Sequence, residues 1–325
     1  MSLIVWSNYE FRPGARELFT AGLAAAGCTL LQSAQSSRSV LTPGRPDLLL
    51  AQAGIAYGQP APDDVMHNLR LRWVALSTAG YTRYDRDDFR AAMRARGVVV
   101  TSASAVFANP CAEHLLAQML AFTRELPKYI LNQAGPRAWN YADGRYSIET
   151  LSGKTVLILG YGAIGKRLAE LLAPFHGRVI AVRRTPRGDE GMETVTEAEL
   201  PRTLALADHV VNTLPESPAT RGRCNKAFFA GMKRGAFFYN IGRGTTVNQD
   251  DLFGALKSGQ VGGAYLDALD PEPLPPAHPL WAAPNCHITP HLGGGHREQD
   301  ESLVRHFLEN LRHFQIGEPL IDRII

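Results

Sequence analysis

The chain has 325 residues, of which 45 % are hydrophobic and 20 % charged, and its formal net charge at pH 7 is +3. This length exceeds what one hydrophobic core usually supports, so we expect two domains. The near-balance of charge provides no basic field of the kind that nucleic-acid-binding or membrane-surface proteins use, so neither partner class is favoured.

The first third of the chain alternates short apolar runs with stretches of helical spacing. Several of the runs are apolar on both faces, as expected for parallel strands that helices cover. The predicted strands are residues 3–7, 48–51, 73–77 and 98–101. The predicted helices are residues 15–27 and 89–96. This order indicates an α/β domain with a parallel sheet.

A long helix predicted over residues 110–124 follows, and its length suits a connector between domains. The next stretch, residues 135–150, is polar but carries the aromatic side chains of Trp139, Tyr141 and Tyr146. These rings could pack against a partner subunit or lie along the surface.

A second β/α series begins at Lys154. Its predicted strands are residues 155–159, 179–182, 209–213, 236–240, 263–267 and 286–289. Its predicted helices are residues 163–173, 197–207, 226–231, 249–258 and 297–314. Five prolines within residues 271–279 exclude a helix or an interior strand there and indicate an extended loop. We therefore expect an α/β fold with two doubly wound parallel sheets.

Cysteine usage and the amino terminus bear on location and metal binding. The cysteines, Cys28, Cys111, Cys224 and Cys286, lie far apart and form no C-x-x-C pair. This spacing predicts neither a zinc site nor a disulfide framework, and a reducing cytoplasm fits it best. Residues 1–10 lack the features of a signal peptide, and no apolar stretch reaches membrane-spanning length. We expect a cytoplasmic protein without a metal site.

Residues 160–165 read GYGAIG and match the G-x-G-x-x-G motif. The motif alone is a weak signal, because glycines occur in any tight turn. Here an apolar strand precedes it and an amphipathic helix follows, so backbone N–H groups at a helix start can meet a pyrophosphate. We predict a dinucleotide site; its members in the motif are Gly160, Gly162, Ala163, Ile164 and Gly165.

The strand after this motif ends in Arg183, Arg184 and Thr185. A site for NAD normally has an acidic residue here, which accepts hydrogen bonds from the adenosine ribose. Two guanidinium groups and a hydroxyl instead suit a 2′-phosphate, which they can hold by charge-assisted hydrogen bonds. The sequence therefore favours NADP, with NAD possible; the alternative is that these arginines form a solvated strand end.

Three further residues stand where strands or rigid loops end. Arg243 follows a predicted strand between two glycines, and Glu272 lies between two prolines. His291 follows the last predicted strand. Because ligands bind outside the carboxyl ends of strands in open α/β sheets, an arginine, a carboxylate and an imidazole could converge at one mouth.

With these blocks in view, the sequence resembles the D-isomer-specific 2-hydroxyacid dehydrogenases, a family that includes glyoxylate and hydroxypyruvate reductases and phosphoglycerate dehydrogenases. The resemblance runs through nearly the whole chain. It is most specific in residues 240–244, 267–273 and 290–291, which follow the family's order and spacing. Residues 112–114, 212–215 with Thr220, and 232–236 also match.

The resemblance implies a role for each matching residue. His291 is implied as the acid/base, Glu272 as its partner and Arg243 as the substrate anchor. His291 and Arg243 then bind substrate together with the backbone N–H groups of the Ala79–Gly80 loop.

Further residues belong to the implied cofactor site. Asp267 resembles the family aspartate that binds the nicotinamide carboxamide. We also place Leu214, Pro215 and Ile241 in this site.

Reduction of a 2-oxo acid requires a proton donor and groups that bind a carboxylate, which these residue types can provide. Reduction of a 2-oxo acid places hydride on the carbonyl carbon while its oxygen gains a proton, which a positioned imidazolium can donate near neutral pH. An ionised glutamate favours the charged imidazole, and an arginine can hold the substrate carboxylate while it polarises the ketone. Residues 104–107 and 79–84 depart from the family's usual pattern, which leaves the substrate's identity open.

We expect a discontinuous, flavodoxin-like substrate domain, residues 1–102 plus 292–325, and an inserted Rossmann domain, residues 103–291. The predicted activity is reduction of a small 2-oxo acid such as glyoxylate or hydroxypyruvate, in a cleft between the domains of a homodimer. The alternatives are an NAD-linked D-2-hydroxyacid dehydrogenase that works oxidatively and a cofactor-sensing regulator on the same scaffold. Turnover of a 2-oxo acid separates the enzyme from the regulator.

Overall fold

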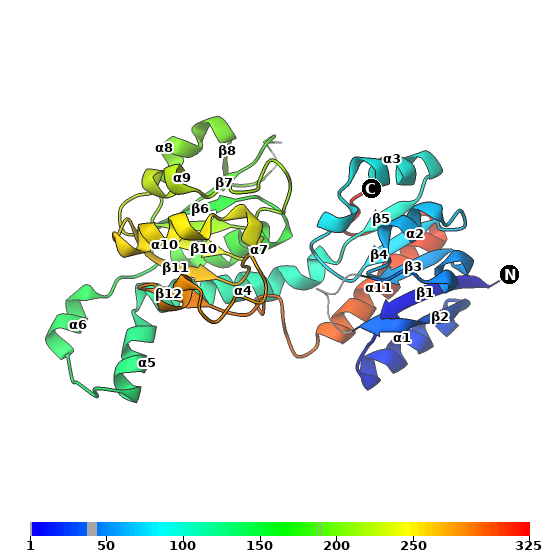
Figure 1. The fold of residues 1–325 in the computed structure, drawn as a ribbon, viewed down its shortest axis with the longest axis horizontal. Helices are drawn as coiled ribbons and strands as arrows, with labels where there is room; N and C mark the ends of the chain where they lie inside the picture. Colours follow the sequence, from blue (N-terminus) through cyan, green and yellow to red (C-terminus); the bar gives the residue numbers. More distant parts are fainter. Residues whose placement is uncertain (1, 38–43, 187, 189) are drawn as a thin grey trace. The chain divides into compact units, whose positions relative to one another are not determined.

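The computed structural model describes residues 2–37, 44–186, 188 and 190–325, and it divides into two compact units (Figure 1). Unit 1 is built from residues 1–107 and 296–325, and unit 2 from residues 108–295. The predicted domain boundaries, after residues 102 and 291, lie a few residues before these divisions. The first turn of α4 (Ser104–Thr123) is tied to unit 1, where Ala105 N donates to Asp322 Oδ2 over 2.7 Å.

Unit 1 contains a five-stranded, fully parallel sheet in the order β2-β1-β3-β4-β5. Its strands are β1 (Leu3–Tyr9), β2 (Cys28–Ser37), β3 (Ile55–Gly58), β4 (Trp73–Leu76) and β5 (Val99–Thr101). This is the strand order of flavodoxin-like folds, in which the order reverses between β1 and β3. The flavodoxin-like topology that the sequence predicted for this part of the chain is confirmed.

Helices cover both faces of the unit 1 sheet. On one face lie α1 (Pro13–Ala25) and α11 (Gln299–Ile316), where the ring of Phe307 stacks on Trp73 with centroids 5.1 Å apart. On the other face lie α2 (Pro62–His67) and α3 (Asp87–Arg96), whose buried Phe89 belongs to the same apolar cluster as Val74. Segments from both parts of unit 1 therefore share one core.

One predicted strand of unit 1 is wrong. Residues 48–51 lie in a 3₁₀ helix, η1 (Leu48–Gln52), because Asp47 caps it: Leu49 N donates to Asp47 Oδ1 over 2.9 Å. The strand at this place in the order is β3, which follows η1 and was not predicted. Strand β2 was not predicted either, because its exposed positions break the apolar run that would have indicated it.

Unit 2 contains a seven-stranded, fully parallel sheet in the order β12-β11-β10-β9-β6-β7-β8. Its strands are β6 (Thr155–Leu159), β7 (Arg178–Val182), β8 (Glu193–Val195), β9 (His209–Asn212), β10 (Ala236–Asn240), β11 (Val261–Leu266) and β12 (Cys286–Ile288). Counted from β6, this is the Rossmann order with one strand added at an edge. The predicted Rossmann sheet is confirmed, with β8 as a strand that was not predicted.

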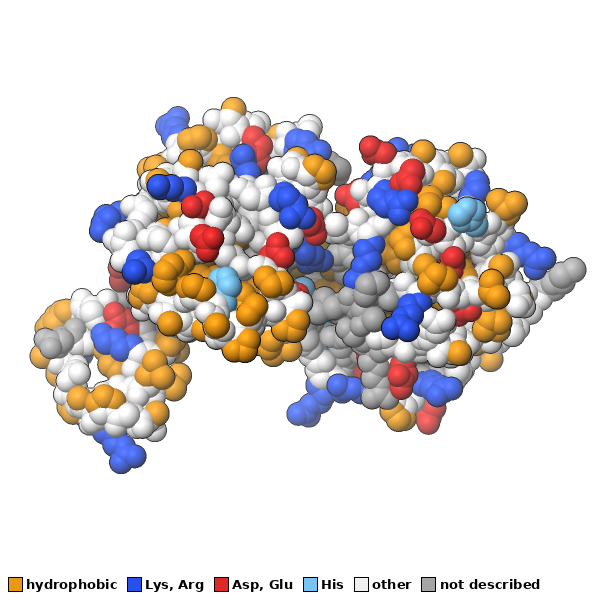
Figure 2. Space-filling model, in the orientation of Figure 1, with side chains coloured by type: hydrophobic (Ala, Val, Ile, Leu, Met, Phe, Trp, Pro, Cys, Tyr) orange, Lys and Arg blue, Asp and Glu red, His pale blue; other side chains and the backbone are white. Residues whose placement is uncertain are grey.

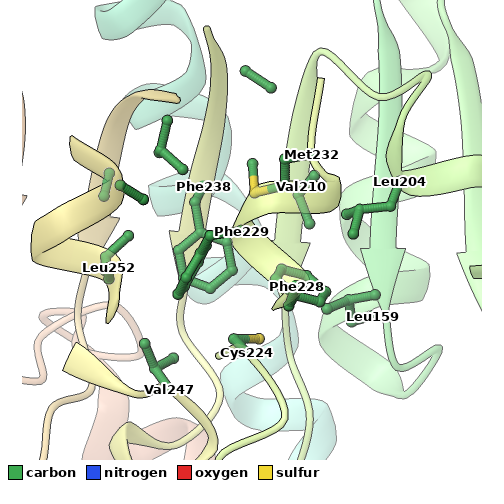
Figure 3. Close-up of a cluster of buried hydrophobic side chains, with 14 of the residues drawn as sticks. Leu159, Leu204, Val210, Cys224, Phe228, Phe229, Met232, Phe238, Val247 and Leu252 are labelled. Carbon is green, nitrogen blue, oxygen red and sulfur yellow. The ribbon is translucent and has the colours of Figure 1, made fainter. Parts of the chain in front are cut away.

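The two faces of the unit 2 sheet carry different helices. Helices α8 (Leu200–Leu204), α9 (Lys226–Gly231) and α10 (Gln249–Lys257) cover one face, where Phe229 meets Phe238 edge to face at 5.3 Å (Figure 3). The opposite face packs against α4 and α7 (Ala163–Leu172). Unit 2 also contains the short 3₁₀ turns η3 (Ala173–Phe175), η4 (Glu197–Glu199), η5 (Gly244–Thr246) and η6 (Pro279–Ala282), and unit 1 contains η2 (Thr82–Tyr84).

Helices α5 (Leu126–Ala134) and α6 (Tyr141–Ser147) form a segment of unit 2 that stands away from its sheet (Figure 1). No residue of α5 is buried. Large apolar side chains on this segment are exposed to solvent (Figure 2): Leu126, Ile130, Leu131, Trp139, Tyr141 and Tyr146. Among the residues that the structure describes, no helix is long and apolar enough to cross a membrane.

Candidate active site

The glycine motif of unit 2 joins β6 to α7 at the point where the strand order reverses. Gly160 has a φ of 88°, which favours glycine, and a Cβ at Gly165 would lie 2.6 Å from the carbonyl oxygen of Gly160. A Cβ at Gly162, by contrast, would meet nothing within 4 Å. The motif therefore brings helix and strand close together and leaves its outer side open.

The start of α7 can bind an anion. Gly162 is the residue before the helix, and no side chain caps it. The first N–H groups of a helix have no partner within the helix, and the helix dipole adds positive potential there. Ala163 and Ile164 lie in this first turn, so the predicted phosphate-binding residues are together in the structure.

The predicted 2′-phosphate residues directly follow β7. Arg184 and Thr185 are exposed. Arg183 is not a solvated strand end, because its side chain is only 23 % exposed and its Nη1 donates to Glu190 Oε1 over 2.8 Å. Glu190 was not singled out in the sequence, where only its distance of a few residues from Arg183 connects the two.

Two buried asparagines at strand ends hold the turn that carries Arg243. Asn212 Nδ2 donates to Asn240 Oδ1 at 2.9 Å and to Thr246 Oγ1 at 2.7 Å. Asn240 Nδ2 and Thr246 Oγ1 in turn donate to the carbonyl oxygen of Arg243, at 3.3 and 2.6 Å. These bonds tie the turn to the ends of β9 and β10, so Arg243 is presented on a rigid backbone.

Leu214, Pro215 and Ile241 lie at the same carboxyl edge. Leu214 N donates to Asn212 Oδ1 over 3.2 Å, and Ile241 N donates to the carbonyl oxygen of Asn212 over 3.1 Å. Gly242 has to be a glycine, since a Cβ there would come within 2.6 Å of the Leu214 carbonyl oxygen. The predicted cofactor residues after β9 and β10 therefore neighbour one another.

His291 and Glu272 form a hydrogen-bonded pair. His291 Nδ1 lies 2.9 Å from Glu272 Oε2 and 3.1 Å from Oε1, and Oε1 also accepts from Leu269 N over 2.9 Å. The two side chains are 27 % and 29 % exposed, so they are half-open to solvent. His291 Nε2 has no partner among the described residues, which leaves it to face a ligand.

The charge state of Glu272 follows from its neighbours. Burial acts to raise its pKa, but hydrogen bonds from His291 and Leu269 N, with the positive charge of Arg243, outweigh burial and lower the pKa. Glu272 is therefore an anion at neutral pH. The charge of Arg243 contributes to this lowering of the Glu272 pKa, so Arg243 lies close enough to the His291–Glu272 pair to influence it.

Asp267 is 2 % exposed and holds the turn that carries His291. Its Oδ1 accepts from Thr289 Oγ1 at 2.6 Å and from Leu292 N at 2.8 Å, and its Oδ2 accepts from Gly293 N at 2.8 Å. His291 itself adopts a φ of 55°, a conformation that this turn enforces. A carboxylate has about four acceptor positions, so one on Oδ2 remains for a further donor.

The predicted substrate loop, Ala79–Gly80, lies in unit 1 after β4. Thr78 Oγ1 donates to the carbonyl oxygen of Gly80 over 2.7 Å, and Gln59 Nε2 donates to Thr78 Oγ1 over 2.9 Å. The backbone N–H groups of Ala79 and Gly80 donate to no described residue. They are therefore available to an anionic ligand.

The residues of unit 2 fit a nicotinamide dinucleotide. The open side of Gly162, the uncapped start of α7 and the guanidinium of Arg183 together suit a chain of phosphates. Within the described residues, no group of three His, Cys, Asp or Glu side chains could hold a metal ion.

Known proteins are similar to this chain in sequence and in structure. A sequence model of "D-isomer specific 2-hydroxyacid dehydrogenase, NAD binding domain" matches residues 116–293. A glyoxylate reductase/hydroxypyruvate reductase from Homo sapiens is 37 % identical over 234 residues, which cover 70 % of this chain and 70 % of that protein.

Two solved structures are similar along the full length. A D-isomer specific 2-hydroxyacid dehydrogenase from Xanthobacter autotrophicus Py2, in complex with NADPH and MES, has a TM-score of 0.81 at 27 % identity and covers 100 % of this chain and 98 % of that one. An NADPH-dependent glyoxylate/hydroxypyruvate reductase from Sinorhizobium meliloti, in complex with NADP and sulfate, has a TM-score of 0.77 at 27 % identity, with 99 % and 98 % covered.

The chain belongs to the D-isomer specific 2-hydroxyacid dehydrogenase family. It is an NAD(P)-dependent oxidoreductase that acts on small 2-oxo or 2-hydroxy acids with a nicotinamide cofactor. The family resemblance seen in the sequence is thereby confirmed.

Proposed function

We propose that this protein reduces a small 2-oxo acid, such as glyoxylate or hydroxypyruvate, with NADPH. The observation that carries the proposal is the His291–Glu272 pair, which lies within the electrostatic reach of Arg243 at the carboxyl edge of the dinucleotide-binding sheet. Relatives with the names of glyoxylate and hydroxypyruvate reductases support the substrate class.

The cofactor supplies hydride when it is bound. The start of α7 would hold its pyrophosphate, and Arg183, Arg184 and Thr185 would hold the 2′-phosphate. The remaining acceptor position on Asp267 suits the amide of the nicotinamide carboxamide. Asp267 then has two functions, since the same carboxylate fixes the His291 turn.

Proton transfer falls to His291. Glu272 holds Nδ1, so the proton that reaches the substrate oxygen leaves from Nε2, and the anionic glutamate stabilises the imidazolium before transfer. Arg243 binds the substrate carboxylate and polarises the ketone, while the Ala79 and Gly80 N–H groups add donors. In the reverse direction, oxidation of a D-2-hydroxy acid, His291 would accept the hydroxyl proton and the other groups would keep their roles.

The proposal is tested by assaying glyoxylate, hydroxypyruvate and larger 2-oxo acids with NADPH and with NADH. We expect the highest kcat/KM for a small 2-oxo acid with NADPH. A higher kcat/KM with NADH in the oxidative direction would favour the NAD-linked dehydrogenase. Binding of NADPH without turnover of any 2-oxo acid would favour a cofactor-sensing regulator.

The arginine at the end of β7 is expected to set the cofactor preference. Arg183→Ala should lower kcat/KM with NADPH by about ten- to a hundredfold and change the value with NADH little, because one charge-assisted hydrogen bond contributes about 1.5–3 kcal/mol. Arg178→Ala is the matched control, since Arg178 starts the same strand and pairs with Glu193. Equal losses with both cofactors would refute a 2′-phosphate role for Arg183.

An Arg183→Asp exchange would be a poorer test than Arg183→Ala. An aspartate at this position would face the carboxylate of Glu190, which is 3 % exposed and now pairs with Arg183. Two buried like charges repel, so that variant would lose stability together with its phosphate contact.

We also propose that the protein is a homodimer that forms through the α5–α6 segment. Isolated apolar side chains are common on surfaces, but this segment gathers six of them, and Trp139 is 93 % exposed. A second copy of the chain would cover them.

Light scattering should therefore give a mass of twice 35.5 kDa. Leu131→Glu should shift it toward the single-chain mass, because a charge would be buried in the interface. Leu48→Glu is the control, since Leu48 is equally an exposed leucine, at 93 %, but lies in unit 1. A wild-type mass near 35.5 kDa would show that the segment has no partner copy.

A further inference from the structure

Glu190 connects three segments around the expected adenosine end of the cofactor. Its Oε1 accepts from Arg183 Nη1 over 2.8 Å, and its Oε2 accepts from Gly188 N over 2.8 Å. Its backbone carbonyl oxygen accepts from the Tyr161 hydroxyl over 3.2 Å. Glu190 therefore bonds to Arg183 at the end of β7, to Gly188, and to Tyr161 of the glycine motif.

The Glu190 side chain is 3 % exposed, although it carries a charge. Both of its oxygens are used inside the protein, so it does not offer an acceptor to a ribose in the way that the acidic residue of an NAD site does. A buried carboxylate with this set of partners instead restricts the conformations of those partners.

Two consequences follow for Arg183. An arginine side chain has several rotatable bonds, and binding a ligand normally costs the entropy of fixing them. The bond to Glu190 fixes the guanidinium before a ligand arrives, and it is made by the Nη1 group of Arg183. The other guanidinium N–H groups can then meet a phosphate in a set orientation.

Tyr161 contributes from the other side. Burial, together with the carboxylates of Glu170 and Glu190, raises the pKa of its phenol, so the hydroxyl remains a donor at neutral pH. Its bond to the Glu190 carbonyl oxygen links the phosphate-binding turn to the loop that follows β7. The G-x-G motif does not specify its middle residue, so the motif alone does not predict this link.

We infer that Glu190 is a positioning residue for recognition of the cofactor's 2′-phosphate. It holds Arg183 and Gly188 in the conformation that receives the phosphate, and the bond from Tyr161 is a second restraint. The inference rests on the proposed use of NADPH.

The test compares two ligands that differ only in the phosphate. Dissociation constants for 2′,5′-ADP and 5′-AMP are measured by calorimetry on the full-length protein. We expect wild type to bind 2′,5′-ADP more tightly. Glu190→Ala should weaken 2′,5′-ADP about fivefold to tenfold, the cost of ordering one or two side chains, and leave 5′-AMP within about twofold.

Two further variants keep the test decisive. Tyr161→Phe removes a single hydroxyl and keeps the ring, so it should fold normally and weaken 2′,5′-ADP by a smaller factor in the same direction. Glu193→Ala is the matched control, because Glu193 pairs with Arg178 at the far end of β7 and should alter neither ligand. Thermal unfolding of each variant separates loss of binding from loss of fold.

The outcomes distinguish the inference from the proposed function. If wild type binds both ligands equally, the NADPH proposal fails, and this inference with it. If wild type prefers 2′,5′-ADP but Glu190→Ala weakens both ligands equally or neither, the inference alone is overturned. Tighter binding of 2′,5′-ADP by Glu190→Ala would also overturn it, because the carboxylate would then act as a competing charge.

Discussion

His291→Ala is expected to lower kcat by about two to four powers of ten, the usual effect of removing a general acid. Nε2 of this residue has no partner among the described residues, and no other described histidine bonds to Glu272. The measurement is steady-state reduction of the best 2-oxo acid found in the panel. Because the imidazole is partly exposed, its loss should change the thermal unfolding temperature little.

Two companion variants qualify this result. His67→Ala removes an exposed histidine of unit 1 and should leave kcat unchanged. Glu272→Gln should cause a smaller loss than His291→Ala, since the amide oxygen can still accept from Nδ1 but no longer provides the negative charge that favours imidazolium. Turnover at the wild-type level in His291→Ala would remove the residue from the mechanism.

Arg243→Lys is expected to lose most activity although the charge is kept. A lysine ammonium cannot contact a carboxylate and a neighbouring ketone with the planar fork of a guanidinium. The backbone around Arg243 is held by Asn212, Asn240 and Thr246, so the shorter reach of a lysine is not recovered by movement of the turn. We expect kcat to fall by about ten- to a hundredfold.

The division between kcat and KM identifies the role of Arg243. A loss in kcat means that the guanidinium stabilises charge that develops on the ketone oxygen in the transition state. A raised KM with an unchanged kcat would instead mean that Arg243 only binds the substrate's carboxylate. That result would contradict the polarising role assigned to it.

The elements of unit 2 were largely predictable, because buried parallel strands leave continuous apolar runs. The predicted ranges for β6, α9 and β10 coincide with the structure. Strand β8 was missed, since it has three residues at the sheet edge and only Val195 is buried. In unit 1, β2 and β3 were missed for a related reason: the first has only two buried residues, Cys28 and Ser33, and the second is four residues long.

Residues of the candidate site could be proposed from the sequence where a motif specifies a residue type, and less so where contacts depend on how the chain folds. Arg243, Glu272 and His291 were identified from their blocks, and unit 2 contains them all. No sequence pattern indicated the ion pair between Arg183 and Glu190, because a contact between residues on either side of a loop depends on the conformation of that loop. The turn-holding bonds of Asp267 were hidden for the same reason.

The split composition of unit 1 determines when it can be completed during synthesis. Unit 2 is contiguous, whereas the face of the first sheet that contains Trp73 is covered by α11, from residues 296–325. Ile324 N also bonds to the carbonyl oxygen of Val100, beside the edge strand β5. On the ribosome, the sheet made first therefore has only α1 on this face, with Trp73 uncovered, until α11 emerges. Unit 2, although made second, can be completed before unit 1.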